Sequence, residues 1–97
     1  PKLSLGRILV VEDEDLIRDT IILTLSEEGY EVLSAADGRE ALEILQACLN
    51  QGNNAETLSL NLVILDLMLP YINGLDLCRL VRREGNSIPI LMLSAKG

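Results

Sequence analysis

Two short aliphatic runs, each followed by carboxylates, constrain the fold of this chain more than any other feature of its sequence. Residues 8–11 are Ile-Leu-Val-Val and precede Glu12 and Asp13, while residues 62–65 are Leu-Val-Ile-Leu and precede Asp66. Uninterrupted runs of this length are typical of strands buried on both faces of a parallel sheet. Because ligands bind beyond the carboxyl ends of such strands, the two runs predict one shared acidic pocket.

Strands and helices are predicted to alternate along the rest of the chain. After the first run, four apolar residues recur at helical spacing: Leu16, Ile17, Ile21 and Leu25. This pattern stops at Gly29, a residue type common just past a helix end, and residues 30–35 indicate a second strand. Asp37 and Glu40 have the spacing of a capping box, in which the Glu side chain returns a bond to the backbone of the cap residue. A second helix is therefore predicted to begin there.

The second half of the chain continues the alternation. The second predicted helix has one apolar stripe, formed by Ala41, Leu42, Leu45, Cys48 and Leu49. An Asn-rich loop follows at residues 50–54. Asn73 is placed to cap a third helix, which Gly85 ends, and residues 88–93 are the fourth predicted strand. The apolar positions of the third helix are Leu75, Leu77, Cys78 and Val81.

The predicted order of elements is that of an α/β domain with a parallel sheet covered on both faces. The chain has 97 residues, which allows one domain, and 48% of them are hydrophobic, which is enough for a packed core. Because parallel strands all end at the same edge, Glu12, Asp13, Asp66 and Ser94 are expected there. The Asn-rich loop is expected at the opposite edge.

Charge and composition exclude several functions. A formal charge of −7 argues against non-specific binding to nucleic acid or to an anionic membrane, since both require excess Lys and Arg. No apolar run approaches the roughly 18 residues of a membrane span, so a cytoplasmic protein is expected. Cys48 and Cys78 lie in apolar helical patterns without metal-ligand spacing, and are expected to be buried thiols.

The three carboxylates predict the chemistry of the pocket. Like charges at close range raise the pKa of at least one group unless a cation is present. Hard oxygen ligands with open positions suit Mg²⁺. With such a cation, Asp66 could act as a nucleophile towards a phosphoryl group and form an aspartyl phosphate.

Three segments of this sequence together resemble the receiver domain of two-component response regulators. They are residues 8–14 (Ile-Leu-Val-Val-Glu-Asp-Glu), residues 65–70 (Leu-Asp-Leu-Met-Leu-Pro) with Gly74, and residues 91–96 (Leu-Met-Leu-Ser-Ala-Lys). The sequences of the first two segments are most similar to those of receivers that carry a winged-helix DNA-binding domain downstream. The resemblance covers essentially the whole chain.

The resemblance implies a flavodoxin-like fold with strand order 2-1-3-4 and a signalling module rather than an enzyme. It implies that a partner histidine kinase phosphorylates Asp66. It implies Mg²⁺ bound by Asp13, Asp66 and the backbone carbonyl of Met68, with Glu12 assisting through water. Ser94 would donate a hydrogen bond to the phosphoryl group.

The resemblance also sets the expected domain organisation. Residues 1–97 are expected to be a receiver domain without the last helix, strand and helix of the family, so the family's phosphate-contacting lysine is missing, and Lys96 does not stand at its position. Residues 88–93 would then form an edge strand through which the chain could self-associate. DNA would be contacted only through a downstream domain.

The sequence argues against several other classes of protein. A P-loop NTPase or a dinucleotide-binding domain needs a glycine-rich loop after the first strand, where Glu-Asp-Glu stands instead. A haloacid-type phosphatase needs a second Asp at position 68, which is Met. Asp13 could merely cap the first helix, and Glu14 is expected to be a solvated carboxylate. The alternative left open is a truncated or pseudo-receiver that binds a partner protein without being phosphorylated.

Overall fold

The computed structural model describes residues 5–50, 60–67, 69, 72–83, 85 and 87–93, with side chains of the second helix described as far as residue 47. Strands and helices alternate as predicted. The elements in chain order are β1 (Arg7–Val11), α1 (Asp15–Glu27), β2 (Glu31–Ala35), α2 (Gly38–Asn50), β3 (Leu62–Asp66), α3 (Gly74–Arg83) and β4 (Ile90–Leu93).

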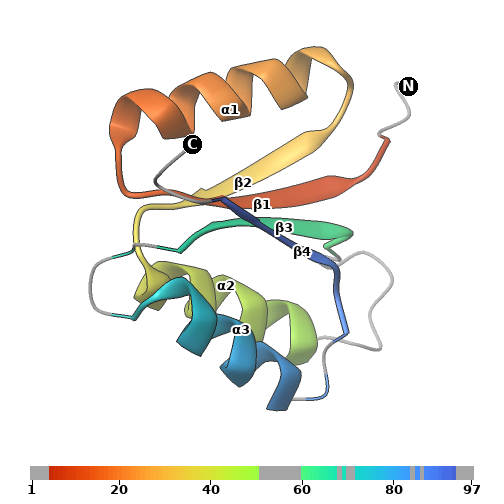
Figure 1. Cartoon of the computed structure of the whole chain (residues 1–97). Helices are drawn as coiled ribbons and strands as arrows, with labels where there is room; N and C mark the ends of the chain where they lie inside the picture. The colour runs from red at the N-terminus through yellow and green to blue at the C-terminus, as the bar shows by residue number, and fades with distance from the viewer. Residues whose placement is uncertain are drawn as a thin grey trace.

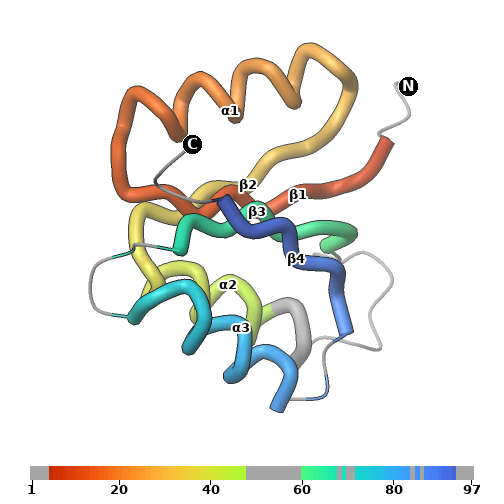
Figure 2. Tube along the Cα trace, viewed as in Figure 1, coloured from red at the N-terminus to blue at the C-terminus, as the bar shows by residue number. Residues whose placement is uncertain are grey.

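The described strands form one parallel sheet in the order β2-β1-β3-β4. Helix α1 covers one face of the sheet, and α2 and α3 lie side by side on the other (Figures 1 and 2). The central strands are in register, with Val11 beside Leu65. This is the order of the first strands in flavodoxin-like folds, so the predicted fold class is confirmed.

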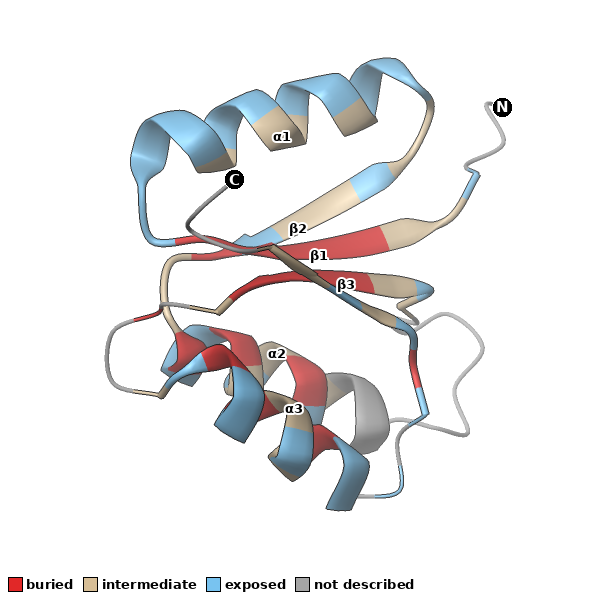
Figure 3. Cartoon of the chain, in the orientation of Figure 1, coloured by how far each residue is buried: buried red, intermediate tan, exposed pale blue. Residues whose placement is uncertain are grey.

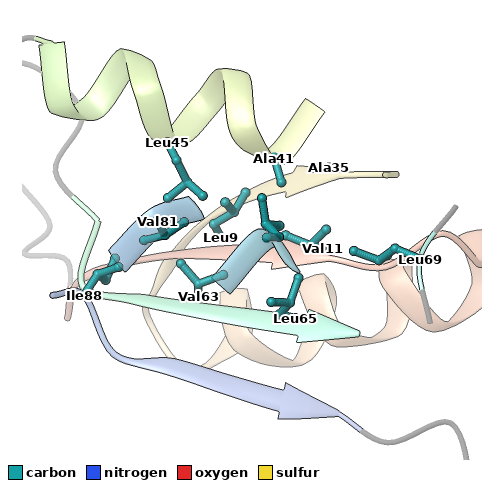
Figure 4. Close-up of a cluster of buried hydrophobic side chains, with 11 residues drawn as sticks. Leu9, Val11, Ala35, Ala41, Leu45, Val63, Leu65, Leu69, Val81 and Ile88 are labelled. Atoms are coloured by element: carbon teal, nitrogen blue, oxygen red, sulfur yellow. The ribbon is translucent and has the colours of Figure 1, made fainter. Parts of the chain in front are cut away.

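The larger core lies between the sheet and the pair α2 and α3. Alternate residues of the central strands, such as Leu9 and Leu65, point into it, and they meet Leu45 of α2 and Val81 of α3 (Figure 4). Burying one such side chain stabilises the fold by about 1.5–3 kcal/mol. The intervening residues Ile8, Val10 and Ile64 form a smaller cluster beneath α1. Burial is therefore concentrated in β1, β3 and the α2–α3 layer, as Figure 3 shows.

The predicted apolar stripe of the first helix is wrong at its start. Leu16 is 79% exposed and Ile17 is 43% exposed, whereas Ile21 and Leu25 pack on the smaller core. The inward position in the first turn belongs to Arg18, which stands three and seven residues before those two apolar positions. Helix α1 has no buried residue at all. Arg18 instead makes polar contacts at this end of the helix.

Both predicted caps are present, with one difference. The N–H of Glu40 donates to Oδ1 of Asp37, but Glu40 Oε1 accepts from the N–H of Ala36, one residue before the cap. Asn73 Oδ1 accepts from the N–H of Asp76 at the start of α3. The helix ends are as predicted too, since Gly29 and Gly85 both have positive φ, of 104° and 85°.

The structure differs from two further predictions, and two more fall largely on residues outside the described ranges. Strand β4 begins at Ile90 rather than at residue 88, and Pro89 before it has no N–H to donate. Cys78 is half-buried rather than buried, and the side chain of Cys48 lies outside the described residues, as does most of the Asn-rich loop. Within the described chain, no helix has both the length and the apolar character needed to cross a membrane.

Candidate functional site

The carboxyl ends of β1 and β3 bring three carboxylates together. One oxygen each from Glu12, Asp13 and Asp66 lies within 4.8 Å of the other two. The adjacent parallel strands cause this grouping, because Val11 and Leu65 are register partners and the acidic residues follow at the same edge. The sequence placed these residues together correctly, while their chemical roles remain predictions.

The three carboxylates differ in exposure. Glu12 is 4% exposed and Asp66 is 8% exposed, whereas Asp13 is exposed to solvent. The cluster is thus a partly buried acidic site with one open side. Two buried carboxylates this close to a third are unfavourable unless protons, hydrogen bonds or a cation offset the charge.

Glu12 is held in place by hydrogen bonds on several sides. Its N–H donates to the carbonyl of Ala35 at 3.1 Å, and its Oε2 accepts from the N–H of Glu14 at 3.0 Å. Burial raises the pKa of Glu12 above its ordinary value of 4.5. The carboxylates of Asp66 and Asp13 raise this pKa further, and the bond from Glu14 lowers it. A bound cation would favour the ionised form.

The backbone after Asp66 is fixed by the sheet and by α3. The N–H of Leu67 donates to the carbonyl of Leu93 at 3.1 Å, and the carbonyl of Leu67 accepts from the N–H of Gly74 at 3.0 Å. A Cβ on Gly74 would lie 2.7 Å from the carbonyl oxygen of Asp66. Gly74 therefore allows α3 to begin directly against the residue that the sequence singles out.

The interpretation of Asp13 as a helix cap is wrong. The N-cap of α1 is Glu14, and no side-chain cap bond is present there. The first helical bond runs from the N–H of Arg18 to the carbonyl of Glu14. The carboxylate of Asp13 instead belongs to the acidic cluster, and Glu14 is exposed, as expected.

Two predicted site residues lie outside the described residues. They are Met68, with its carbonyl, and Ser94. Within the described site, the donor set fits Mg²⁺: it consists of carboxylate oxygens, one of them on an exposed side chain that leaves room for water ligands. Glu12, Asp13 and Asp66 could hold such an ion.

Sequence reasoning missed Arg18. Its guanidinium donates from Nη1 to the carbonyl oxygen of Glu12 at 2.9 Å, at the edge of the acidic cluster. A signal was available, because an Arg interrupts the apolar positions in the first turn of the predicted helix. Its spacing from Asp15, however, is that of an ordinary surface ion pair.

Comparison with known proteins adds independent observations. The family model of the response regulator receiver domain matches residues 8–97. A probable transcriptional regulatory protein of Picosynechococcus sp. is 61% identical over 91 residues, and the alkaline phosphatase synthesis transcriptional regulatory protein SphR of Synechococcus elongatus is 56% identical over 91 residues. Each match covers 94% of this chain and 35% of the relative. The chain thus spans about a third of the length of these curated relatives.

A solved structure shows the same arrangement of elements. The response regulator protein TrrA of Thermotoga maritima, in complex with Mg²⁺ and BeF, is 35% identical and superposes with a TM-score of 0.76. The match covers 96% of this chain and 72% of TrrA.

Proposed function

Because this chain belongs to the family of response regulator receiver domains, we propose that Asp66 accepts a phosphoryl group from a histidine kinase in a two-component system. The observation that carries this proposal is the position of Asp66. It is a buried carboxylate at the end of a central strand, within 4.8 Å of two other carboxylates. A receiver is a signalling module rather than an ordinary enzyme, and Asp66 is its proposed acceptor.

The proposed step is an in-line transfer to one carboxylate oxygen of Asp66. The oxygen–phosphorus bond forms as the bond between phosphorus and the nitrogen of the kinase phosphohistidine breaks, and the nitrogen keeps the electron pair. Mg²⁺, when bound, would neutralise charge on the transferring phosphoryl oxygens. Asp66 stands at the end of β3, which pairs with a neighbouring strand on each side, and this placement favours a fixed geometry of attack.

The remaining site residues have proposed supporting roles. Asp13 and Asp66 would bind Mg²⁺ directly together with the backbone carbonyl of Met68, and Glu12 would assist through a water molecule. Ser94 would donate a hydrogen bond to the phosphoryl group. The all-oxygen donor set of the cluster supports the metal assignment, and so does the complex of the related TrrA with Mg²⁺ and BeF.

We further propose that residues 1–97 act as the receiver part of a cytoplasmic transcription regulator. The similarity to transcriptional regulatory proteins of Picosynechococcus and Synechococcus supports this role. The formal charge of −7 is unfavourable for DNA contact by this chain, so DNA would be bound by another part of the regulator.

Self-association through β4 is proposed for the 97-residue chain. In the described sheet, β4 is an edge strand beside β3, and Leu91 on it is 53% exposed. Edge strands with apolar side chains favour pairing with a second copy.

Phosphorylation can be tested by incubating the chain with acetyl phosphate and Mg²⁺ and measuring its intact mass. We expect one phosphoryl adduct in the wild type and in Glu14→Gln, and none in Asp66→Asn. An adduct that survives Asp66→Asn would place the nucleophile elsewhere. A wild-type chain without adduct would favour the alternative function, a pseudo-receiver that binds a partner protein without phosphorylation.

A further inference from the structure

We propose that Arg18 is a positioning residue for the acidic site, and that it holds the connection between β1 and α1 in the shape that cation binding requires. The inference rests on the proposed function, because it concerns the affinity of the site for Mg²⁺. The Arg18 guanidinium donates from Nη1 to the carbonyl oxygen of Glu12 at 2.9 Å and from Nη2 to Oδ1 of Asp15 at 2.6 Å. It thereby joins the two ends of the segment that contains Asp13.

The partly buried environment of Arg18 favours these two hydrogen bonds. Its side chain is only 17% exposed, and it occupies the inward side of the first turn of α1, in line with Ile21 and Leu25. A guanidinium withdrawn from water needs acceptors for its N–H groups. Its planar fork offers two parallel donors in a fixed geometry, so both acceptors are held at defined positions relative to the helix.

The hydrogen bond from Arg18 to the main chain restrains Glu12. The sheet holds its N–H through Ala35, and the connection itself holds its carboxylate through Glu14. The bond from Arg18 to its carbonyl is the contact that ties Glu12 to the body of α1. Without it, a carbonyl of a buried residue would lose its donor, and the peptide that leads from Glu12 to Asp13 could rotate. The distance between Asp13 and Asp66 would then no longer be fixed.

The direction in which Mg²⁺ affinity changes when Arg18 is replaced distinguishes a positioning role from a purely electrostatic one. Removing a nearby positive charge lowers the repulsion felt by Mg²⁺, so on Coulomb's law alone the loss of Arg18 should strengthen cation binding. A positioning role predicts the opposite, because residues that orient metal ligands typically contribute about 10–100-fold to affinity.

The first test measures the affinity for Mg²⁺ by calorimetric titration of the wild type, Arg18→Met and Arg7→Met. Met keeps the apolar stem of Arg but has no N–H donors. Arg7 is the matched control, because it forms an ion pair with Glu31 at 2.8 Å near the start of β1, away from the acidic site. We expect Arg18→Met to bind about tenfold more weakly than the wild type and Arg7→Met to bind with unchanged affinity. Equal or tighter binding by Arg18→Met would overturn the inference.

The second test needs no metal. Amide hydrogen exchange of the Glu14 N–H, which donates to the Glu12 carboxylate, should become several-fold faster in Arg18→Met and partly recover in Arg18→Lys, while exchange at Leu9 and Val10 stays unchanged. A merely structural role would instead speed exchange along β1 as well. Unchanged exchange at Glu14 would refute the inference, whatever affinity for Mg²⁺ the titration gives. If the wild type bound no Mg²⁺, the proposed metal site would fail instead, along with the affinity part of this inference.

Discussion

Gly74 lies directly against Asp66, so that a Cβ added to the glycine would stand 2.7 Å from the aspartate carbonyl oxygen and 2.9 Å from Cα of Leu67. Both contacts are with backbone atoms, which cannot move aside as a flexible side chain would. The start of α3 and the backbone after the proposed phosphoryl acceptor therefore form one packed unit.

Gly74→Ala should push the start of α3 away from the backbone of Asp66 and Leu67. We expect a loss of about 1–3 kcal/mol in the free energy of unfolding, as in other overpacked sites, and slower formation of the acetyl phosphate adduct. Gly85→Ala is the control: its Cβ meets open space, but its φ of 85° costs roughly 1–2 kcal/mol. Gly85→Ala should thus lose stability and keep the adduct rate. Similar adduct rates in both variants would contradict the role given to Gly74.

Asp13→Asn should weaken Mg²⁺ binding by about tenfold or more, a change of about 1.4 kcal/mol in binding free energy. The exposed carboxylate of Asp13 is one of three oxygens that can meet at the cation. Calorimetric titration measures the effect, with Glu14→Gln as a neighbouring control that removes the same charge outside the cluster. If the two variants bound Mg²⁺ equally well, Asp13 would not be a ligand.

Glu12→Gln should stabilise the metal-free protein at neutral pH. The pKa of Glu12 is raised in the folded state, so between 4.5 and the raised value the folded state holds more protons than the unfolded state. Stability from this group is therefore present below 4.5 and is lost as the pH rises through the folded pKa. Gln keeps an acceptor for the Glu14 N–H but carries no charge. Urea unfolding at several pH values should show a smaller decline towards neutral pH in the variant, and parallel profiles would speak against this account.

Leu77→Ala should cost about 2–5 kcal/mol of unfolding free energy, because Leu77 is buried in the larger core. Leu75→Ala, two residues earlier in the same helix, removes an exposed side chain and should change stability by less than about 0.5 kcal/mol. Urea unfolding of both variants checks the predicted difference. Equal losses would mean that α3 packs on the sheet with another face.

Leu91→Lys should reduce self-association of the chain, because a lysine on an edge strand opposes pairing with a second copy. Leu16→Lys is the matched control, since Leu16 is also exposed but lies on α1. Sedimentation at micromolar concentration should show a larger species for the wild type and the control, and a monomer for Leu91→Lys. A wild-type chain that sediments as a clean 10.6 kDa monomer would rule out association through β4.

The sheet could be predicted from the sequence because the aliphatic runs of β1 and β3 are short, continuous and bounded by polar residues. Parallel pairing then fixes which residues share an edge, and this is why Glu12, Asp13 and Asp66 could be placed together. The rotation of α1 could not be predicted in the same way. Hydrophobic periodicity predicted that Ile17 would point inward. In the structure Arg18 takes the inward position of the first turn, where its guanidinium has two hydrogen-bond acceptors.

The part of the site that escaped prediction depends on main-chain atoms. The role of Arg18 depends on the carbonyl of Glu12, and that of Gly74 on the carbonyl of Asp66, and a sequence does not show where carbonyl groups point. Parallel strand order alone placed Ser94 at this edge, but its hydrogen bond and the metal contact of the Met68 carbonyl were assigned only through the family resemblance. Because both residues lie outside the described residues, their roles stay predictions.

The absence of buried residues from α1 has a consequence for how this protein can evolve. Folding depends mainly on the opposite layer, so substitutions at the exposed Leu16, Ile17 and Leu23 carry little penalty for folding. The constrained positions of this helix are Arg18, through its polar contacts, and the inward apolar residues that pack on the smaller core. The outward surface of α1 can therefore accept substitutions that leave the fold and the acidic site undisturbed.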